Sequence, residues 1–262
     1  MRRKYIRPQS KAALWSPRFG LFAVALLLTA LVLHRFGFIQ TVNLPYITAL
    51  AGISAGCGLV FAFLGLRALW QEGYKGGLSC VKGGLLAFMA LAPLLFIGAA
   101  WFAFPPLYDI TTDFDKPPAF LAGSRPADAL EVKADFTPAA AEEQWAAWPQ
   151  LSGRRYDGSP DTVLKAVYAV LKAKNWPISG EQGKVGEDSL LLVEVVAKTF
   201  VLGFVSDIII RLSDEGDTSF VDMRSASRYL PRDYGINARF IADFMSRLDA
   251  EILSLPVDET RD

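Results

Sequence analysis

Residues 78–104 read LSCVKGGLLAFMALAPLLFIGAAWFAF, an apolar stretch with a single charged residue, Lys82. About 20 apolar residues are enough to cross the roughly 30 Å hydrocarbon layer of a bilayer as a helix. Two similar stretches precede it, at residues 19–39 and 46–69. Because two spans follow the first stretch directly, we interpret it as a retained span and not as a cleaved signal peptide. The sequence therefore predicts three transmembrane helices.

The sequence after these stretches has the composition of a water-soluble domain. Residues 109–262 contain 17 basic and 26 acidic residues, a net charge of −9, although the whole chain has a net charge of zero. Phosphate backbones repel an acidic domain, so we expect no nucleic-acid binding. We predict a membrane anchor at residues 1–104, an extended Pro-rich connector at 105–125 and a soluble domain at 126–262.

Basic residues flank the three predicted spans unequally, and cytoplasmic flanks carry the excess of Lys and Arg. The loop after the first span offers only Arg35. The N-terminal segment and the loop between the second and third spans hold the others: Arg2, Arg3, Lys4, Arg7, Lys11, Arg18, Arg67, Lys75 and Lys82. These two segments are therefore predicted to be cytoplasmic. An odd number of spans then places the C-terminal domain in the periplasm, if the membrane is a bacterial inner membrane.

The soluble part contains neither His nor Cys. The His and Cys residues of the chain all lie within or beside the predicted spans: His34, Cys57 and Cys80. This excludes a Ser-His-Asp or Cys-His nucleophilic site, a zinc site with the usual ligands and a disulfide framework. Asp109, Asp113 and Asp115 lack the spacing of an EF-hand, so we interpret them as residues that cap turns. We expect no metal and no cofactor.

Hydrophobic periodicity predicts an α+β fold for the soluble part. Thr137 and Pro138 begin a short helix that ends before Pro149, and a second helix runs from Ser159 to about Asn175. From there the apolar period is two, which predicts four strands and then a last helix, at residues 177–182, 189–198, 204–212, 219–228 and 235–253. Consecutive strands with short loops pair antiparallel. We therefore predict a two-layer domain in which an antiparallel sheet packs against helices.

Alternation along residues 220–228 separates the two faces of the last strand, because successive side chains point to opposite sides. Val221 and Met223 mark the inward face, which two serines share. The opposite face is predicted to be open and to combine with the preceding strand into a charged patch of Asp207, Arg211, Asp222, Arg224 and Arg228. Such a patch is either a cross-strand ladder of ion pairs or a binding site for an anion.

The soluble part also contains an ordered set of motifs: Asp109–Asp113 (DITTD), Pro117–Phe120 (PPAF), Gly203–Asp207 (GFVSD), Asp222–Arg228 (DMRSASR), Asp233–Asn237 (DYGIN) and Arg239. Together they resemble the bacterial family known as domain of unknown function 1499. The resemblance implies a fold and a location, since relatives carry N-terminal spans and occur in bacterial envelopes, but it implies no activity. Two positions depart from the family pattern: Leu230 replaces a Gly, and Ser206 replaces an acid.

The motif residues admit two accounts. In the structural account Asp233 caps the last helix, Gly235 takes a turn conformation, and Arg239 pairs with Asp233 or Asp207. In the functional account a pocket for a phosphate or carboxylate lies at the positive end of that helix. Its predicted ligand-binding residues are Asp207, Arg224, Ser225, Ser227, Arg228, Asp233, Asn237 and Arg239. Strand alternation partly opposes this pocket, because the two serines face away from the two strand arginines.

The function that the sequence favours is an inner-membrane-anchored periplasmic protein with a non-catalytic binding or interaction domain. Its expected partners are the lipid bilayer and an anionic lipid or small anionic metabolite of the cell envelope. The alternative is a metal-independent enzyme that uses Asp207 or Asp233 as a general base.

A third hypothesis is assembly with another envelope protein, through Trp145, Trp148 and the spans. Gly52 and Gly56 lie four residues apart in the second span, a spacing that lets helices approach closely. We interpret this spacing either as packing among the three helices of one chain or as a homodimer contact.

Overall fold

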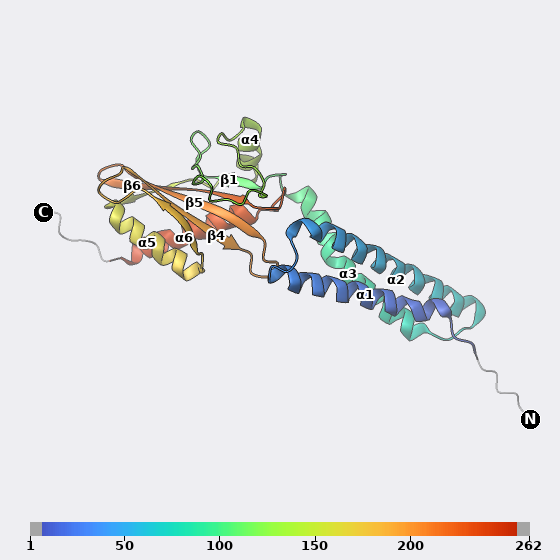
Figure 1. The fold of residues 1–262 in the computed structure, drawn as a ribbon. Coiled ribbons are helices and arrows are strands. Elements are labelled where there is room, and N and C mark those ends of the chain that lie inside the picture. The colour runs from blue at the N-terminus through green and yellow to red at the C-terminus, as the bar shows by residue number, and fades with distance from the viewer. Residues whose placement is uncertain (1–6, 256–262) are drawn as a thin grey trace, which may run out of the picture. The chain divides into compact units, whose positions relative to one another are not determined.

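The computed structural model describes residues 7–255 of the 262-residue chain. The chain forms two compact units, which divide between Ala103 and Phe104. The first unit is helical and the second is a mixed α+β domain (Figure 1).

The first unit consists of α1 (Lys11–Arg35), α2 (Leu44–Glu72) and α3 (Gly77–Ala103), with a 3-10 turn η1 (Thr41–Asn43) before α2. All three helices are long and apolar enough to cross a membrane, which confirms the three predicted helices. Small residues let the helix backbones approach: Ala23, Ala55, Ala87 and Ala90 pack together, and Ser16 Oγ donates to the carbonyl oxygen of Gly58 at 2.9 Å.

The two glycines of the predicted dimer contact differ in their surroundings. A Cβ atom at Gly52 would lie 3.1 Å from Leu94 Cδ1 of α3 in the same chain, whereas a Cβ atom at Gly56 would meet nothing within 4 Å. Gly52 therefore serves packing within the bundle, and a homodimer through this face stays a proposal.

The second unit is built on an antiparallel sheet in the order β1-β6-β5-β4-β3, with β2 also paired to β6. The strands are β1 (Asp109–Thr111), β2 (Arg154–Asp157), β3 (Ile178–Gln182), β4 (Leu190–Lys198), β5 (Val205–Asp214) and β6 (Thr218–Ser227), and the helices are α4 (Pro138–Ala147), α5 (Pro160–Lys174) and α6 (Ile236–Ser254). The predicted α+β class and antiparallel sheet are confirmed.

One face of the sheet packs on α5 and α6 and forms the hydrophobic core. Alternate residues of the long strands supply it, among them Val193, Ile208 and Met223, together with Ile241 and Phe244 of α6. All five are buried. This two-layer packing agrees with the predicted amphipathic faces of the two helices.

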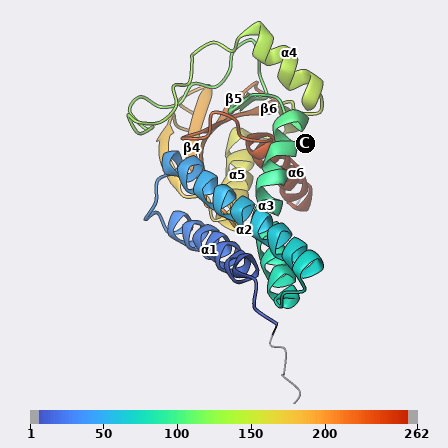
Figure 2. The same ribbon diagram turned by 90° about the vertical axis from the view of Figure 1, so that its right-hand side faces the viewer.

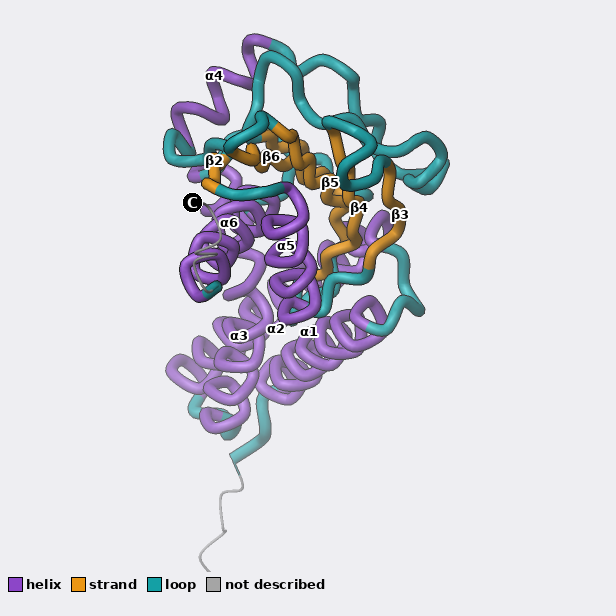
Figure 3. The backbone as a smooth tube through the Cα atoms, turned by 90° about the vertical axis from the view of Figure 1, so that its left-hand side faces the viewer, coloured by secondary structure: helices purple, strands orange, loops and turns teal. Residues whose placement is uncertain are grey.

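The other face of the sheet is covered, so the prediction of an open charged face is wrong. Residues 112–136, here called the strap, cross this face and lead into α4. The strap and α4 lie on the side of the sheet opposite α5 and α6 (Figures 2 and 3). Arg224, expected to project outward, is only 1 % exposed. Alternation along β6 sorted the side chains correctly, but it cannot show what covers each face.

Two short strands were not predicted, and both lie along β6. β1 pairs with Arg224–Ala226 and β2 with Thr218–Val221, so they occupy the same edge at opposite ends. Strands of three and four residues are too short to show a hydrophobic period. β1 also lies inside the segment expected to be an extended connector, and it begins the sheet domain.

Candidate functional site

Charged residues cluster on the strap-covered face of the sheet, where each arginine of the predicted patch contacts a carboxylate. Register explains the clustering. Asp207, Ala226 and Asp109 lie across from one another on β5, β6 and β1, and Arg211 lies across from Asp222. Cross-strand partners point to the same face, so the sheet itself brings these charges together.

Arg224 is held by one carboxylate and two strap carbonyl groups. Its Nε and Nη2 donate to the two oxygens of Asp109 at 3.0 and 2.7 Å, and Nη2 also donates to the carbonyl oxygen of Lys133 at 2.6 Å. Its Nη1 donates to the carbonyl oxygen of Pro118 at 3.4 Å. The planar guanidinium thus joins β6, β1 and both halves of the strap.

Asp207 is shared between two arginines. Arg228 donates from Nε and Nη2 to its carboxylate, with the shortest contact at 2.6 Å, and Arg125 of the strap places Nε 3.6 Å from it. Asp207 is 1 % exposed, whereas the side chains of Arg228 and Arg125 are 20 % and 12 % exposed. Burial lowers the pKa of Arg125, and the nearby Asp207 partly offsets this effect.

Arg211 bridges the sheet and the strap. It donates to Asp222 on β6 and to Asp113 in the strap, both at 2.9 Å. Burial raises the pKa of Asp222 to about 6, although Arg211 acts in the opposite direction. Asp222 Oδ1 has no hydrogen-bond partner among residues 7–255, which agrees with a carboxyl group that burial favours in its protonated form.

A second polar network lies on the helix side of β6. Asn237 accepts a hydrogen bond from Ser225 Oγ at 2.7 Å, and its amide nitrogen donates to Ser227 Oγ at 3.1 Å and to the carbonyl oxygen of Tyr108 at 2.8 Å. The two serines and Asn237 are all buried. This network fastens α6 to β6 and to the residues that lead into β1.

Asp233 occupies the N-terminus of α6. Its two carboxylate oxygens accept from the backbone N–H groups of Gly235 and Asn237 at 2.9 and 2.6 Å. Burial raises the pKa of Asp233, and these hydrogen bonds act against the rise. Gly235 has a φ of 76°, a left-handed conformation that Gly adopts without strain. The positive end of α6 is therefore satisfied by a residue of the chain itself.

The eight predicted site residues do not form one pocket. Arg224, Arg228 and Asp207 lie on the strap-covered face, whereas Ser225, Ser227, Asn237 and Asp233 lie on the helix side. Arg239 is exposed, and its Nε donates to the carbonyl oxygen of Gly235 at 3.4 Å.

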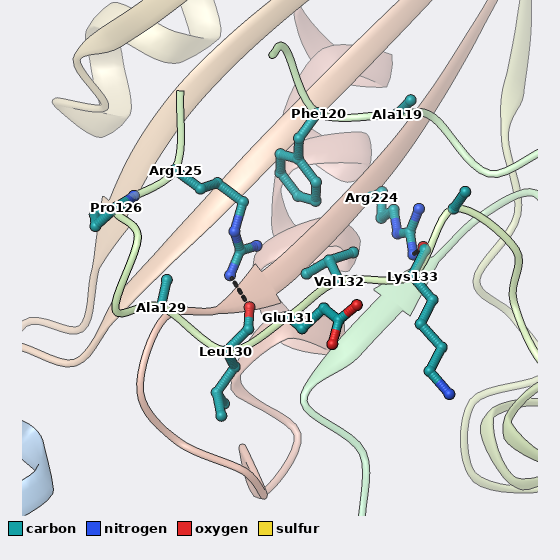
Figure 4. Close-up of a pocket in the computed structure, with 11 residues that line it drawn as sticks. Ala119, Phe120, Arg125, Pro126, Ala129, Leu130, Glu131, Val132, Lys133 and Arg224 are labelled. Carbon is teal, nitrogen blue, oxygen red and sulfur yellow. Dashed lines mark hydrogen bonds between the residues drawn. The ribbon is translucent and has the colours of Figure 1, made fainter. Parts of the chain in front are cut away.

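A cavity of about 370 Å³ lies between the strap and the sheet (Figure 4). Figure 4 shows the guanidinium of Arg125 beside the Phe120 ring, whose centroid is 5.0 Å away, and bonded to the carbonyl oxygen of Leu130. Arg224 and Lys133 also line the cavity. Arg125 Nη1 has no hydrogen-bond partner among the described residues.

Sequence reasoning missed Arg125 and Glu194. Glu194 Oε2 accepts from the backbone N–H of Leu121 at 2.9 Å, so this residue also anchors the strap. A signal for Glu194 was present, since it is the one charged residue in the apolar run from Leu190 to Ala197. Arg125 lies in a loop without regular secondary structure, and no local pattern distinguishes it from a solvated surface residue.

The acidic residues that follow the third helix fasten the strap. Asp113 Oδ1 accepts from the backbone N–H groups of Asp115 and Lys116, both at 3.0 Å, which is a side-chain-capped turn. Among residues 7–255, no group of three or more His, Cys, Asp or Glu side chains is arranged to hold a metal ion.

Comparison with known proteins identifies the second unit. No curated protein matches the chain. The family model described as "Protein of unknown function (DUF1499)" matches residues 109–248, which run from the first residue of β1 into α6 and include every charged residue of the strap-covered face. The chain therefore belongs to the DUF1499 family.

Proposed function

We propose that this protein is a membrane-anchored, non-catalytic binding module that takes a small anionic ligand into the cavity between the strap and the sheet. The observation that carries the proposal is Arg125. It is the arginine at this cavity whose Nη1 is buried without a partner among the described residues, whereas Arg224 is bonded to Asp109 and to strap carbonyls. An anion that accepted from Nη1 would satisfy it.

The surroundings of Arg125 suit an anion with an apolar part. Phe120 supplies an aromatic face, and the cavity wall holds the basic residues Lys133 and Arg224 besides Arg125, against one acidic residue, Glu131. Arg125 shares its carboxylate neighbour, Asp207, with Arg228, which makes three closer contacts with it. An anionic lipid headgroup or an envelope metabolite is the ligand class that these groups fit.

The hydrogen bonds of Asp207 and Asp233, the two candidate general bases, favour a binding role over catalysis. Both Asp207 oxygens accept from Arg228, and both Asp233 oxygens accept from the backbone of α6. Each residue is at most 1 % exposed. A general base needs a lone pair within reach of the substrate proton, and these carboxylates use theirs to hold the fold.

We further propose that the anchor lies in a bacterial inner membrane with the DUF1499 domain in the periplasm. The basic residues beside α1 and between α2 and α3 support this orientation, together with the few basic residues between α1 and α2.

The test of ligand binding is native mass spectrometry of the full chain extracted gently from its own membrane, with identification of co-purifying lipids and metabolites. We expect an anionic species on the wild type and on Arg154→Gln, whose side chain lies away from the cavity. We expect its loss from Arg125→Gln and its partial retention by Arg125→Lys, with the circular dichroism of all variants unchanged. A ligand that Arg125→Gln retains, or a wild type without ligand, would contradict the proposal.

A further inference from the structure

The hairpin loop between β4 and β5 presents three consecutive exposed apolar side chains. Phe200, Val201 and Leu202 are 86 %, 62 % and 42 % exposed. The loop is closed tightly: the Thr199 N–H donates to the carbonyl oxygen of Phe204 and the Phe204 N–H donates to Thr199 Oγ1, both at 2.9 Å. These hydrogen bonds close the loop at its base, and the three apolar side chains are exposed at its tip. An exposed apolar cluster of this kind marks a contact surface.

Strand register places this tip at the end of the sheet where the chain enters. Asp109 lies across from Ala226, Ala226 lies across from Asp207, and Asp207 lies across from Val196, so all four are at one level of the sheet. Beyond that level in the same direction lie the residues before β1, the C-terminal end of β6 and the β4–β5 loop.

Backbone hydrogen bonds confirm that the entering segment is fixed at this end. The Ser227 N–H donates to the carbonyl oxygen of Tyr108 at 2.8 Å, and the Asp233 N–H donates to that of Leu107 at 3.0 Å. Arg232 donates to the carbonyl oxygen of Phe104, the residue that follows α3 directly in the chain. The chain therefore comes from its last candidate membrane helix into the end of the sheet that carries the apolar tip.

The hairpin loops at the two ends of the sheet differ in chemistry in the way that a bilayer surface would require. At the tip end, residues 199–203 carry no charge, and the exposed Lys198 precedes them. At the far end, β5 ends at Asp214, and the turn into β6 contains Glu215 and Asp217. Lipid headgroups accept apolar and basic side chains and, where they are anionic, repel acidic ones. The acidic hairpin turn is thus at the end of the sheet away from the entry of the chain.

We propose that the β4–β5 hairpin tip is a membrane-contact element that places Phe200, Val201 and Leu202 in the interface of the bilayer that holds the anchor. This contact is separate from the ligand cavity and holds whether or not that cavity binds an anion. It would give the domain a second attachment to the membrane besides the chain itself and so fix its orientation over the lipid.

The test uses two single-cysteine variants of the full chain in lipid nanodiscs, in a background where Cys57 and Cys80 are replaced by Ala. Val201→Cys reports on the tip, and Val185→Cys, in the exposed β3–β4 loop at the far end, is the matched control. Each is labelled with a small fluorophore and exposed to nitroxide-labelled lipids, which quench from the acyl chains, and to iodide, which quenches from water.

We expect the lipid nitroxides to quench the probe at position 201 several-fold more than the probe at position 185, and iodide to show the reverse. Phe200→Ser/Leu202→Ser in the Val201→Cys background should reduce the lipid quenching to the level of the control. A probe at position 201 that iodide quenches as strongly as at position 185 would overturn the proposal. Protection from both quenchers would also overturn it, because a protein surface would then cover the tip. Lipid quenching that survives the double serine variant would overturn the assignment to these side chains.

Discussion

Arg224 and Asp109 are 115 residues apart in the chain and form a two-point ion pair, with Nε–Oδ1 and Nη2–Oδ2 distances of 3.0 and 2.7 Å. Asp109 is the first residue of β1, and Arg224 lies on β6 across from Thr111, the last residue of β1. The pair therefore fixes the start of the DUF1499 domain to β6, the strand next to β1 in the sheet. The sequence left open whether Arg224 belongs to a ladder of ion pairs or to an anion site, and this ion pair gives it a structural role.

Arg224→Ala should lower the free energy of unfolding of the domain by about 3–5 kcal/mol, because it leaves the Asp109 carboxylate unpaired in a largely buried position. Urea unfolding of the full chain in detergent, followed by the circular dichroism of the sheet, measures this change. Arg247→Ala is the control: Arg247 is 55 % exposed and pairs with Asp243 on its own helix, so a change within about 0.5 kcal/mol is expected. Equal stability of the two variants would contradict the structural role of Arg224.

Asp222 should make the stability of the domain depend on pH. Its pKa is raised to about 6 in the folded protein, whereas an unfolded Asp titrates near 3.9, about 2 units lower. Between these values the folded state holds a proton that the unfolded state has lost, so this contribution favours folding at low pH and is lost as the pH rises through about 6.

Relative to Asp222→Asn, which does not titrate at this position, the wild type should lose about 3 kcal/mol between roughly pH 3.5 and pH 7. Taking the difference between the two proteins at each pH cancels the contributions of the other carboxyl groups. A difference that stays constant with pH, or that grows in favour of the wild type, would show that Asp222 is charged throughout.

Asp233→Ala should lower the free energy of unfolding by about 2 kcal/mol, because the N–H groups of Gly235 and Asn237 lose their acceptors in a buried position. Ser159→Ala provides the comparison, since Ser159 is the N-cap of α5 but makes no side-chain bond to the helix backbone. Its loss should stay below about 0.5 kcal/mol. If Asp233→Ala and Ser159→Ala lowered the free energy of unfolding equally, the carboxylate of Asp233 would not be the group that stabilises α6.

The spacing of apolar residues predicted those helices and strands in which the spacing repeats along the chain. The three apolar helices, the amphipathic α5 and α6 and the four long strands each repeat a period over enough residues to be recognised. Their bounds agree within a few residues, except that α1 begins at Lys11, eight residues before the start of the predicted span at residue 19. Alternation along β6 also placed Ser225 and Ser227 on the face away from Arg224, as the structure has them.

The covering of the second sheet face could not be predicted, because the contacts that hold the strap to the sheet are long-range. The strap has no hydrophobic period, and it is held by side chains far away in sequence, such as Arg224 on Lys133 and Glu194 on Leu121. Whether an arginine on a strand faces water, a ligand or a covering segment depends on these contacts. For the same reason the cavity beside Arg125 had no signal in the sequence.

Gln144 of α4 takes the place of a neighbouring strand for β1. Its side-chain amide donates to the carbonyl oxygen of Thr111 at 2.6 Å and accepts from the Thr111 N–H at 3.1 Å, and both residues are fully buried. Gln144→Leu fills a similar volume but leaves the N–H and the carbonyl oxygen of Thr111 without their partners. It should therefore lower the free energy of unfolding by about 2–3 kcal/mol. It should also speed hydrogen exchange of the Thr111 amide, which mass spectrometry of peptides from the labelled protein detects.

Glu143→Ala, at the neighbouring exposed position of the same helix, should leave both the stability and the exchange rate unchanged. Thr111 is the last residue of β1 and the point where the chain turns into the strap. If the Thr111 amide exchanged as slowly in Gln144→Leu as in the wild type, pairing with β6 alone would hold β1 in the sheet. The contact with α4 would then not be needed to fix the start of the strap.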